Sequence, residues 1–177
     1  MLIGLTGAAG AGKGSVAHRL VMHHGFAEIA FADPLYEAVA AITGISVANL
    51  QDRAIKEQPI PWIGKSPREL LQLLGTEFGR KMVKESLWID RAMRRLVPFT
   101  AITDVRFDNE AEAVKARGGV IWEVVRPTKS CLVGASATHE SESGISRNFI
   151  DLVLPNTGTL EGLWGGVDAA MRQATGC

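Results

Sequence analysis

Cysteine is scarce in this chain, because only Cys131 and Cys177 occur among its 177 residues. Two isolated cysteines provide neither a disulfide framework nor a structural zinc site. Thiols stay reduced in the cytoplasm, so the composition predicts a cytoplasmic protein rather than a disulfide-stabilised secreted one.

An excess of charge of either sign is also absent, since 19 basic residues balance 19 acidic ones. This balance gives no general attraction to nucleic acid, so no nucleic-acid partner is expected. The chain lacks a run of about 18 apolar residues, and its N-terminus leads directly into a strand pattern, so we expect no membrane partner. Hydrophobic residues make up 46% of the chain, which is enough for a single globular domain over residues 1–177.

A glycine-rich loop near the N-terminus carries the strongest chemical signal. Residues 7–15 read GAAGAGKGS, between an apolar strand pattern at 2–6 and a helix pattern at 13–24. In such a loop, backbone N–H groups surround phosphate oxygens, a lysine adds positive charge, and the helix N-terminus favours the anion. The sequence therefore predicts a nucleoside triphosphate site. Its expected ligands are Ala8, Ala9, Gly10, Ala11, Gly12, Lys13, Gly14 and Ser15.

The residue after the lysine indicates which class of nucleotide-binding protein the loop belongs to. A Ser or Thr that holds Mg²⁺ usually follows directly, whereas here Gly14 separates Lys13 from Ser15. The string resembles the variant found in adenylate kinase and its relatives, which hold Mg²⁺ largely through water, and it favours a small-molecule kinase. Ser15 either assists the metal or only begins the helix.

Strand patterns alternate with helix patterns along the chain. Strands are expected at 2–6, 26–31, 100–103, 120–125 and 150–154, and helices at 13–24, 34–43, 47–56, 66–80, 87–96, 108–117 and 159–173. This alternation predicts an α/β fold, with a parallel sheet flanked by helices on both faces. Together with the phosphate loop, it resembles the P-loop kinase fold. Ligands of such sheets bind at the carboxyl ends of the strands. Strand patterns are followed there by Asp33, Asp104, Arg126 and Asn156.

The charged residues at this edge each have two interpretations. Asp33 either contacts the acceptor substrate or caps the helix that Pro34 begins. Asp104 either binds the water shell of Mg²⁺ or caps the helix near residue 108. Arg106 is either a phosphate ligand or the partner of Asp104.

The helix beginning after Ser66 is the second strong signal. Ser66, Pro67 and Glu69 form a capping-box pattern. At 100° per residue, an apolar arc of Leu70, Leu71, Leu74 and Phe78 is expected to face the core, opposite a polar stripe of Arg68, Gln72, Thr76 and Arg80.

The polar stripe is either a phosphate- and base-binding face or an ordinary solvated one. Gly75 and Gly79 beside it favour close approach by another group, since each costs a helix about 1 kcal/mol relative to Ala. Glu77, at the edge of the apolar arc, needs a partner for its charge, and one of the arginines of the stripe is a candidate. Trp88 either stacks on a base or packs in the core.

Residues 127–147 show no clear period and are expected to form a lid. His139 and Glu142 within it are read either as groups that close on phosphates or as parts of a solvated loop.

Taken together, the motifs resemble the bacteriophage-type deoxynucleoside monophosphate kinases. The matching segments include the phosphate loop, FADPL, RELLQLLGTEFGR, DVRFDNEA, HESE and NTGTL, which span nearly the whole chain. The resemblance implies transfer of the γ-phosphoryl group of ATP to a deoxynucleoside monophosphate, with Mg²⁺. It implies a monophosphate-binding helical region at about 44–96. Two departures are Gly14, where Asp is common, and Tyr36, where Lys is common and Lys65 or Arg68 is a substitute.

The resemblance also implies roles for individual residues. Catalytic roles fall to Lys13, Asp33, Arg80, Asp104 and Arg126, with Ser15 and Asp104 serving Mg²⁺ through water. Asn156, Thr157 and Gly158 join Arg126 at ATP. The substrate is assigned Asp33, Lys65, Arg68, Gln72, Thr76, Glu77, Arg80, Trp88, Arg106, His139 and Glu142.

Other functions stay open at this stage. A dephospho-coenzyme A kinase or a phosphomevalonate kinase shares the loop chemistry, and a nucleotide-responsive binding protein needs only the binding part. The expected state is a monomer or a homodimer. For a phage-encoded protein, the expected location is the host cytoplasm.

Overall fold

The computed structural model describes residues 1–127 and 144–175. The chain forms two compact units, one made of Met1–Ala30 with Arg95–Cys177 and the other of Phe31–Arg94. Among the described residues, no helix has the length and apolar character needed to cross a bilayer.

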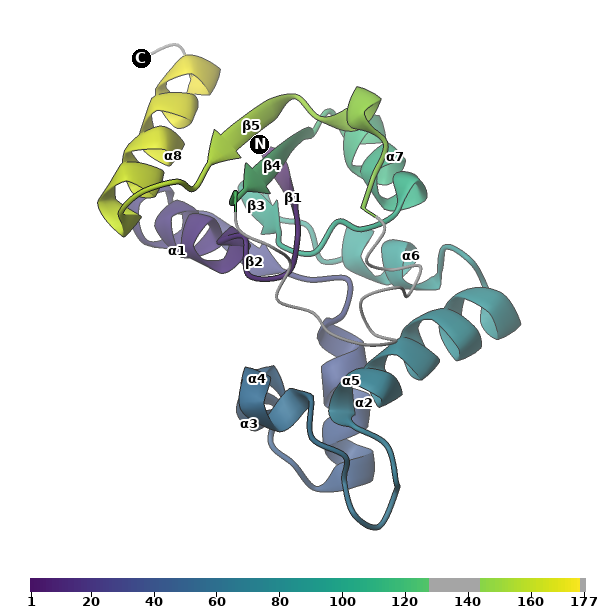
Figure 1. The fold of residues 1–177 in the computed structure, drawn as a ribbon. Helices are drawn as coiled ribbons and strands as arrows, with labels where there is room; N and C mark the ends of the chain where they lie inside the picture. The colour runs from purple at the N-terminus through teal and green to yellow at the C-terminus, as the bar shows by residue number, and fades with distance from the viewer. Residues whose placement is uncertain (128–143, 176–177) are drawn as a thin grey trace. The chain divides into compact units, whose positions relative to one another are not determined.

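A five-stranded parallel sheet forms the centre of the first unit (Figure 1). Its strands are β1 (Leu2–Thr6), β2 (Ala27–Ile29), β3 (Thr100–Ile102), β4 (Val120–Val125) and β5 (Leu152–Pro155), in the order β2-β3-β1-β4-β5. All neighbouring pairs are parallel, so every carboxyl end lies at one edge of the sheet. The predicted α/β fold with a parallel sheet is confirmed, although β2 is shorter than the pattern at 26–31 indicated.

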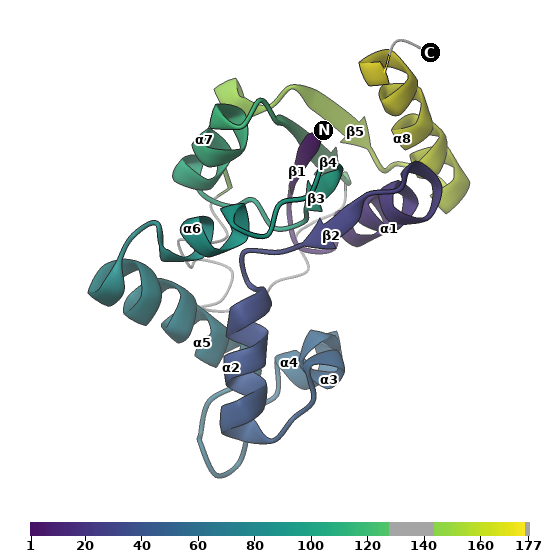
Figure 2. The ribbon, with the colours of Figure 1, turned by 180° about the vertical axis from the view of Figure 1, so that it is seen from behind.

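Helices cover both faces of this sheet (Figures 1 and 2). On one face, α1 (Lys13–His24) and α8 (Leu160–Thr175) bury an apolar core that includes Leu5, Trp122 and Val167. On the other face lies α7 (Asp108–Ala116), packed on β1 and β4. At position 4 in β1, a Cβ would lie 2.6 Å from Ile121 Cδ1 and 2.9 Å from Val105 Cγ2, so the packing there requires glycine.

Polar contacts hold α8 against α1. Arg19 donates two hydrogen bonds to the Asp168 carboxylate, at 3.0 and 2.7 Å, and His24 lies 2.9 Å from the same group. The bonds from Arg19, and then those from His24, hold the pKa of the Asp168 carboxyl well below its usual range. Trp164 donates its indole N–H to the Ser15 carbonyl at 3.1 Å. The helix that follows the phosphate loop is therefore anchored near both of its ends.

The second unit is helical. It contains α2 (Asp33–Thr43), α3 (Val47–Gln51), α4 (Arg53–Lys56), α5 (Pro67–Gln72), the π-helix η1 (Leu73–Val83) and α6 (Leu87–Met93). Its core is built from Leu35, Val39, Leu50 and Leu71. The short 3₁₀ turn η4 (Arg147–Phe149) belongs to the first unit.

The π-helix explains one wrong prediction. Phe78, expected in the core, is 49% exposed, whereas Leu71 is buried. The i→i+5 bonds of a π-helix widen each turn, so the 100° projection fails from residue 73 onward. The carbonyl of Gly75 within this segment accepts the indole N–H of Trp88 at 2.8 Å.

Candidate active site

In the loop between β1 and α1, several carbonyl groups accept hydrogen bonds from donors in the first unit. Lys13 Nζ donates to the carbonyls of Gly7 at 2.5 Å and Ala8 at 3.1 Å. The Ala8 carbonyl also accepts from Ala11 N, and the Gly12 carbonyl accepts from Val16 N, both at 3.1 Å. The carbonyls of Gly7, Ala8 and Gly12 are thus satisfied by the protein itself.

The N–H side of the same loop differs. The backbone N–H groups of Ala9, Gly10, Gly12, Gly14 and Ser15 donate to no acceptor within the described part of the chain. Ala9, Gly12 and Ser15 are half-buried, and N–H groups with little access to water need partners. A cluster of N–H groups at a helix N-terminus suits an anion. The helix itself starts without a side-chain cap, at Gly12. The loop therefore has the hydrogen-bonding character of a phosphate site.

Two glycines set the path of this loop. Gly7 has φ +126° and Gly12 has φ +114°, both in the region that favours glycine. A Cβ on Gly7 would overlap the carbonyl oxygen of Val124 in β4. A Cβ on Gly12 would lie 2.6 Å from the Asn156 amide nitrogen. The loop can take this course only without side chains at these positions.

Asp104 and Arg106 follow β3 at the carboxyl edge, beside the end of β1. Val105 N donates to the Leu5 carbonyl at 3.1 Å, which extends the β1–β3 pairing. Glu110, which is buried, accepts from Arg106 N at 2.8 Å and Phe107 N at 3.2 Å. The residue that caps α7 is Phe107, so Asp104 does not cap this helix. The Mg²⁺ role of Asp104 stays a prediction, as does a phosphate contact by Arg106.

Arg126 and the turn 156–158 lie at the same edge, after β4 and β5. Arg126 is exposed, and so are Thr157 and Gly158. Asn156 is half-buried, and its side chain donates to the Ala11 carbonyl at 2.8 Å. The structure therefore brings the phosphate loop, Asp104, Arg106, Arg126 and Asn156 to one edge of one sheet.

In the second unit, the start of α5 is fixed as the sequence predicted. Ser66 Oγ accepts from Glu69 N at 3.3 Å, and Glu69 Oε2 accepts from Ser66 N at 2.8 Å. The bond from the Ser66 backbone, followed by that from its hydroxyl, lowers the pKa of the Glu69 carboxyl. This capping box orients the turn that carries Arg68.

The expected polar stripe is largely buried rather than solvated. Thr76 is 4% exposed. Arg68 Nε donates to Glu57 at 2.7 Å, and its side chain is only 11% exposed. The side-chain nitrogen Nε2 of Gln72 is buried and has no hydrogen-bond partner among the described residues. An unsatisfied buried amide costs about 1–3 kcal/mol, so a ligand contact here would recover stability.

The structure shows which side chains contact Gly75, Gly79 and Glu77, the residues beside this stripe. A Cβ on Gly79 would lie 2.5 Å from Nε1 of Trp88, and a Cβ on Gly75 would lie 3.0 Å from Leu35. The close approach that the two glycines indicated is therefore made by these protein side chains. Glu77 pairs with Lys81 at 3.0 Å on an exposed surface.

Three further residues predicted for the site lie in the second unit. Arg80 is half-buried and Lys65 is exposed. Asp33 is the first residue of α2, whose cap position is occupied by Ala32, so the capping interpretation of Asp33 is wrong. Substrate contacts of all three, and of Trp88, stay predictions.

Sequence reasoning missed two polar residues. Glu123 pairs in register with Thr6 at the end of β1, and its Oε2 is buried without a hydrogen-bond partner in the described ranges. An acid within the apolar run of β4 was the available signal. Lys56 donates to the Tyr36 hydroxyl, and its ammonium lies 4.8 Å from the centre of the Tyr36 ring. This pairing of an aromatic with a distant cation left no local pattern.

His139 and Glu142, assigned to the expected lid at 127–147, lie outside the described residues.

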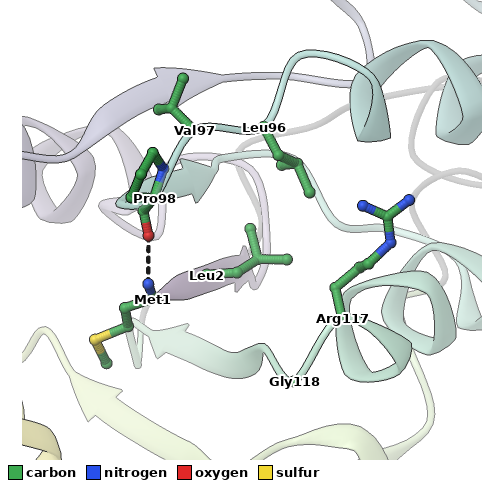
Figure 3. A pocket seen from close by; sticks show the side chains of 7 residues that line it. All are labelled: Met1, Leu2, Leu96, Val97, Pro98, Arg117 and Gly118. Atoms are coloured by element: carbon green, nitrogen blue, oxygen red, sulfur yellow. Dashed lines mark hydrogen bonds between the residues drawn. The ribbon is translucent and has the colours of Figure 1, made fainter.

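A cavity of about 310 Å³ lies at the opposite edge of the sheet (Figure 3). Met1, Leu2, Leu96, Val97, Pro98, Arg117 and Gly118 line it. These residues precede β1, β3 and β4 or begin them, so the cavity is at the amino ends of the strands. It contains none of the residues predicted for the site.

Oxygen ligands suitable for Mg²⁺ are present beside the loop. Mg²⁺ prefers hard oxygen donors and keeps several waters. The Ser15 hydroxyl and the Asp104 carboxylate are such donors, and the unpartnered buried oxygen of Glu123 is a third. Within residues 1–127 and 144–175, no group of three or more His, Cys, Asp or Glu side chains forms a metal site. The donor set suits a metal held mainly by water and phosphate oxygens.

A parallel sheet of order β2-β3-β1-β4-β5, with a phosphate-binding loop after its central strand, defines the P-loop kinase class. The structure is similar to dephospho-CoA kinase from Campylobacter jejuni, with a TM-score of 0.52 and 12% identity over 98% of this chain and 96% of that one. Identity this low supports the fold alone.

Residues 42–167 match the family described as deoxynucleotide monophosphate kinase, and the chain belongs to this family. It is 32% identical to a mimivirus protein assigned as a deoxynucleotide monophosphate kinase (Acanthamoeba polyphaga mimivirus), over 99% of this chain and 98% of that protein. It is 36% identical to the deoxynucleoside-5′-monophosphate kinase of Escherichia phage T5, over 51% of this chain and 39% of that one.

Membership makes the chain an enzyme that phosphorylates nucleotides. Kinases of this class use ATP, generally with Mg²⁺, and act on a small-molecule nucleotide. A dephospho-coenzyme A kinase, a phosphomevalonate kinase and a binding protein without transfer activity are not favoured by these matches.

Proposed function

We propose that this enzyme transfers the γ-phosphoryl group of ATP to the 5′-phosphate of a deoxynucleoside monophosphate, giving a deoxynucleoside diphosphate and ADP. The observation that carries the proposal is the loop in which four carbonyls accept hydrogen bonds from the protein, while five backbone N–H groups have no acceptor within the described part. Such a loop suits the triphosphate of the donor. The acceptor class follows from the family and from the names of its viral relatives.

The reaction is a direct in-line displacement. An oxygen of the acceptor phosphate forms a bond to the γ-phosphorus while the bond from that phosphorus to the β–γ bridging oxygen breaks, and ADP leaves. The acceptor oxygen already carries negative charge, so positioning and charge neutralisation dominate over base catalysis. Bound Mg²⁺ supplies further neutralisation of the donor phosphates, with Ser15 and Asp104 assigned to its water shell and Glu123 as an added acid.

Lys13 has the central catalytic role in this scheme. In the structure its ammonium bonds to two loop carbonyls. When the triphosphate enters, the same ammonium exchanges these carbonyls for β- and γ-phosphate oxygens, which is a stronger, charge-assisted interaction. Arg126 adds positive charge on the donor side.

The acceptor is assigned to the second unit. Arg68, Arg80 and Lys65 are proposed to hold its phosphate, with Asp33 orienting the acceptor. Arg106 is proposed separately as a phosphate ligand. Lys56 beside Tyr36 supplies a cation near the position where the family commonly has lysine. Gln72 is proposed to read the base edge, because its buried amide nitrogen has no hydrogen-bond partner among the described residues.

A coupled ADP-release assay tests the function. The purified protein is given ATP and Mg²⁺ with each of the four common deoxynucleoside monophosphates, their ribose counterparts, dephospho-coenzyme A and phosphomevalonate. We expect ADP release that depends on at least one deoxynucleoside monophosphate. ADP release only with one of the other acceptors, or ATP binding without ADP formation on any of them, would contradict the proposal.

Two attributes of the enzyme belong to the same proposal. The named relatives are viral, so we assign its action to the cytoplasm of an infected cell. A monomer or a homodimer remains the prediction for its oligomeric state.

A further inference from the structure

We infer that Asn156 is a positioning residue that holds the phosphate loop in its binding conformation. The inference rests on the proposed function, in which that loop holds the phosphates of ATP. The side-chain amide of Asn156 donates to the Ala11 carbonyl at 2.8 Å, across a sequence separation of 145 residues. This contact differs from the contact with ATP that the family resemblance implies for Asn156, because it is made to the loop itself.

The backbone on either side of Asn156 is held by contacts with neighbouring elements. Asn156 N donates to the Val125 carbonyl at 2.8 Å, which ties the turn after β5 to the end of β4. α8 begins four residues later, and its Trp164 bonds to the Ser15 carbonyl. In Figure 1, the segment between β5 and α8 runs beside the start of α1. The chain on both sides of Asn156 is therefore held against the loop and its helix.

The loop is shaped to receive this amide. Gly12 takes φ +114°, and a Cβ there would lie 2.6 Å from Asn156 Nδ2 and 3.4 Å from Leu163 Cδ2. Because Gly12 has no side chain, the Asn156 amide can come close to the loop. Ala11 is 3% exposed, so its carbonyl has little access to water and needs a protein donor.

With the hydrogen bond from Asn156, four loop carbonyls each have a donor within the protein. Lys13 engages the carbonyls of Gly7 and Ala8, Val16 engages that of Gly12, and Asn156 engages that of Ala11. With the carbonyls held in this way, the opposing N–H groups are preorganised for phosphate, which spares their ordering cost on binding. Loss of the Asn156 amide removes this restraint without removing any proposed phosphate contact.

The test uses Asn156→Asp, which keeps the shape but replaces the donor with an acceptor facing the Ala11 carbonyl. Asn156→Ala removes the group without adding charge, and Val153→Ala is the control at an exposed position of β5, three residues before Asn156. Affinities for ATP, GTP and inorganic tripolyphosphate are measured by calorimetry, together with that for the preferred monophosphate. Circular dichroism confirms that each variant is folded.

We expect Asn156→Ala to weaken binding of ATP, GTP and tripolyphosphate by one common factor, roughly tenfold for one lost hydrogen bond. Asn156→Asp should weaken all three further, because its added negative charge repels the phosphates. The monophosphate affinity and the ATP-to-GTP ratio stay unchanged, and Val153→Ala behaves as wild type. General destabilisation would not select the triphosphates in this way.

Weaker ATP binding with unchanged tripolyphosphate binding would assign Asn156 to adenine and overturn the inference, as would unchanged affinities throughout. A wild-type protein that binds ATP and transfers no phosphoryl group refutes the proposed function alone, because the binding comparison is independent of transfer.

Discussion

Replacing Gly79 by alanine tests the packing of the π-helix. The added Cβ would lie 2.5 Å from Nε1 and 2.6 Å from Cε2 of Trp88. The indole is rigid and is held by its 2.8 Å hydrogen bond to the Gly75 carbonyl, so it cannot turn aside without breaking that bond. Overpacking of this kind costs about 1–3 kcal/mol, and the lost hydrogen bond costs about 1 kcal/mol more.

A smaller effect has the opposite sign. Alanine is favoured over glycine in helices by about 1 kcal/mol. The net expectation is that Gly79→Ala lowers the free energy of unfolding by about 1–3 kcal/mol. Gly165→Ala is the matched control, because Gly165 lies in α8, is exposed, and would place its new Cβ more than 4 Å from any other described side chain or neighbouring element. It should gain about 0.5–1 kcal/mol.

Urea unfolding followed by far-UV circular dichroism and by tryptophan fluorescence measures both variants. The fluorescence signal of Gly79→Ala is also expected to change in the folded protein, because the surroundings of Trp88 change. If Gly79→Ala were as stable as Gly165→Ala, the close packing of Trp88 on the π-helix would be refuted.

Three further changes test other parts of the fold. Ser66→Ala removes the capping box of α5 and should cost roughly 1 kcal/mol in urea unfolding; an unchanged midpoint would refute that contact. Asp168→Asn removes the charged acceptor for Arg19. The pKa of the Asp168 carboxyl is lower in the folded protein than in the unfolded one, so its stabilisation is present above the unfolded value of about 3.9 and is lost as the pH falls toward the folded value. The difference in unfolding free energy between wild type and variant should therefore be constant near neutral pH and shrink below about pH 4. A gap that grows in acid would contradict this. Gly7→Ala, which forces a side chain onto positive φ and onto the Val124 carbonyl, should cost about 2 kcal/mol or more, whereas Gly14→Ala enters open space and should leave unfolding unchanged within about 0.5 kcal/mol; equal losses for both would refute the loop geometry.

Local signals explain why much of the fold could be predicted. Gly25 and Gly44 end α1 and α2 with positive φ, as glycine after a helix pattern indicates. Ser66 and Glu69 form the capping box that their spacing predicts. The phosphate loop is likewise a contiguous motif, so its place between β1 and α1 followed from a few residues.

Features that depend on contacts distant in sequence were not predictable. The π-helix involves Trp88, which lies 13 residues beyond the carbonyl that it contacts, and periodicity assumes α-helical turns. The bond from Asn156 to Ala11 joins opposite ends of the chain. Glu123 and Lys56 gained interest only once the register of β4 and the position of Tyr36 were known.

The central claim is that the loop around Lys13 passes a phosphoryl group from ATP to a deoxynucleoside monophosphate. The most direct measurement follows label from γ-³²P ATP into product for the wild type and for Lys13→Met. The account predicts labelled deoxynucleoside diphosphate with the wild type and a rate at least about 100-fold lower with the variant, since loss of one group that stabilises transition-state charge costs this much. Label that appears only in inorganic phosphate, or a variant that turns over at the wild-type rate, would contradict it.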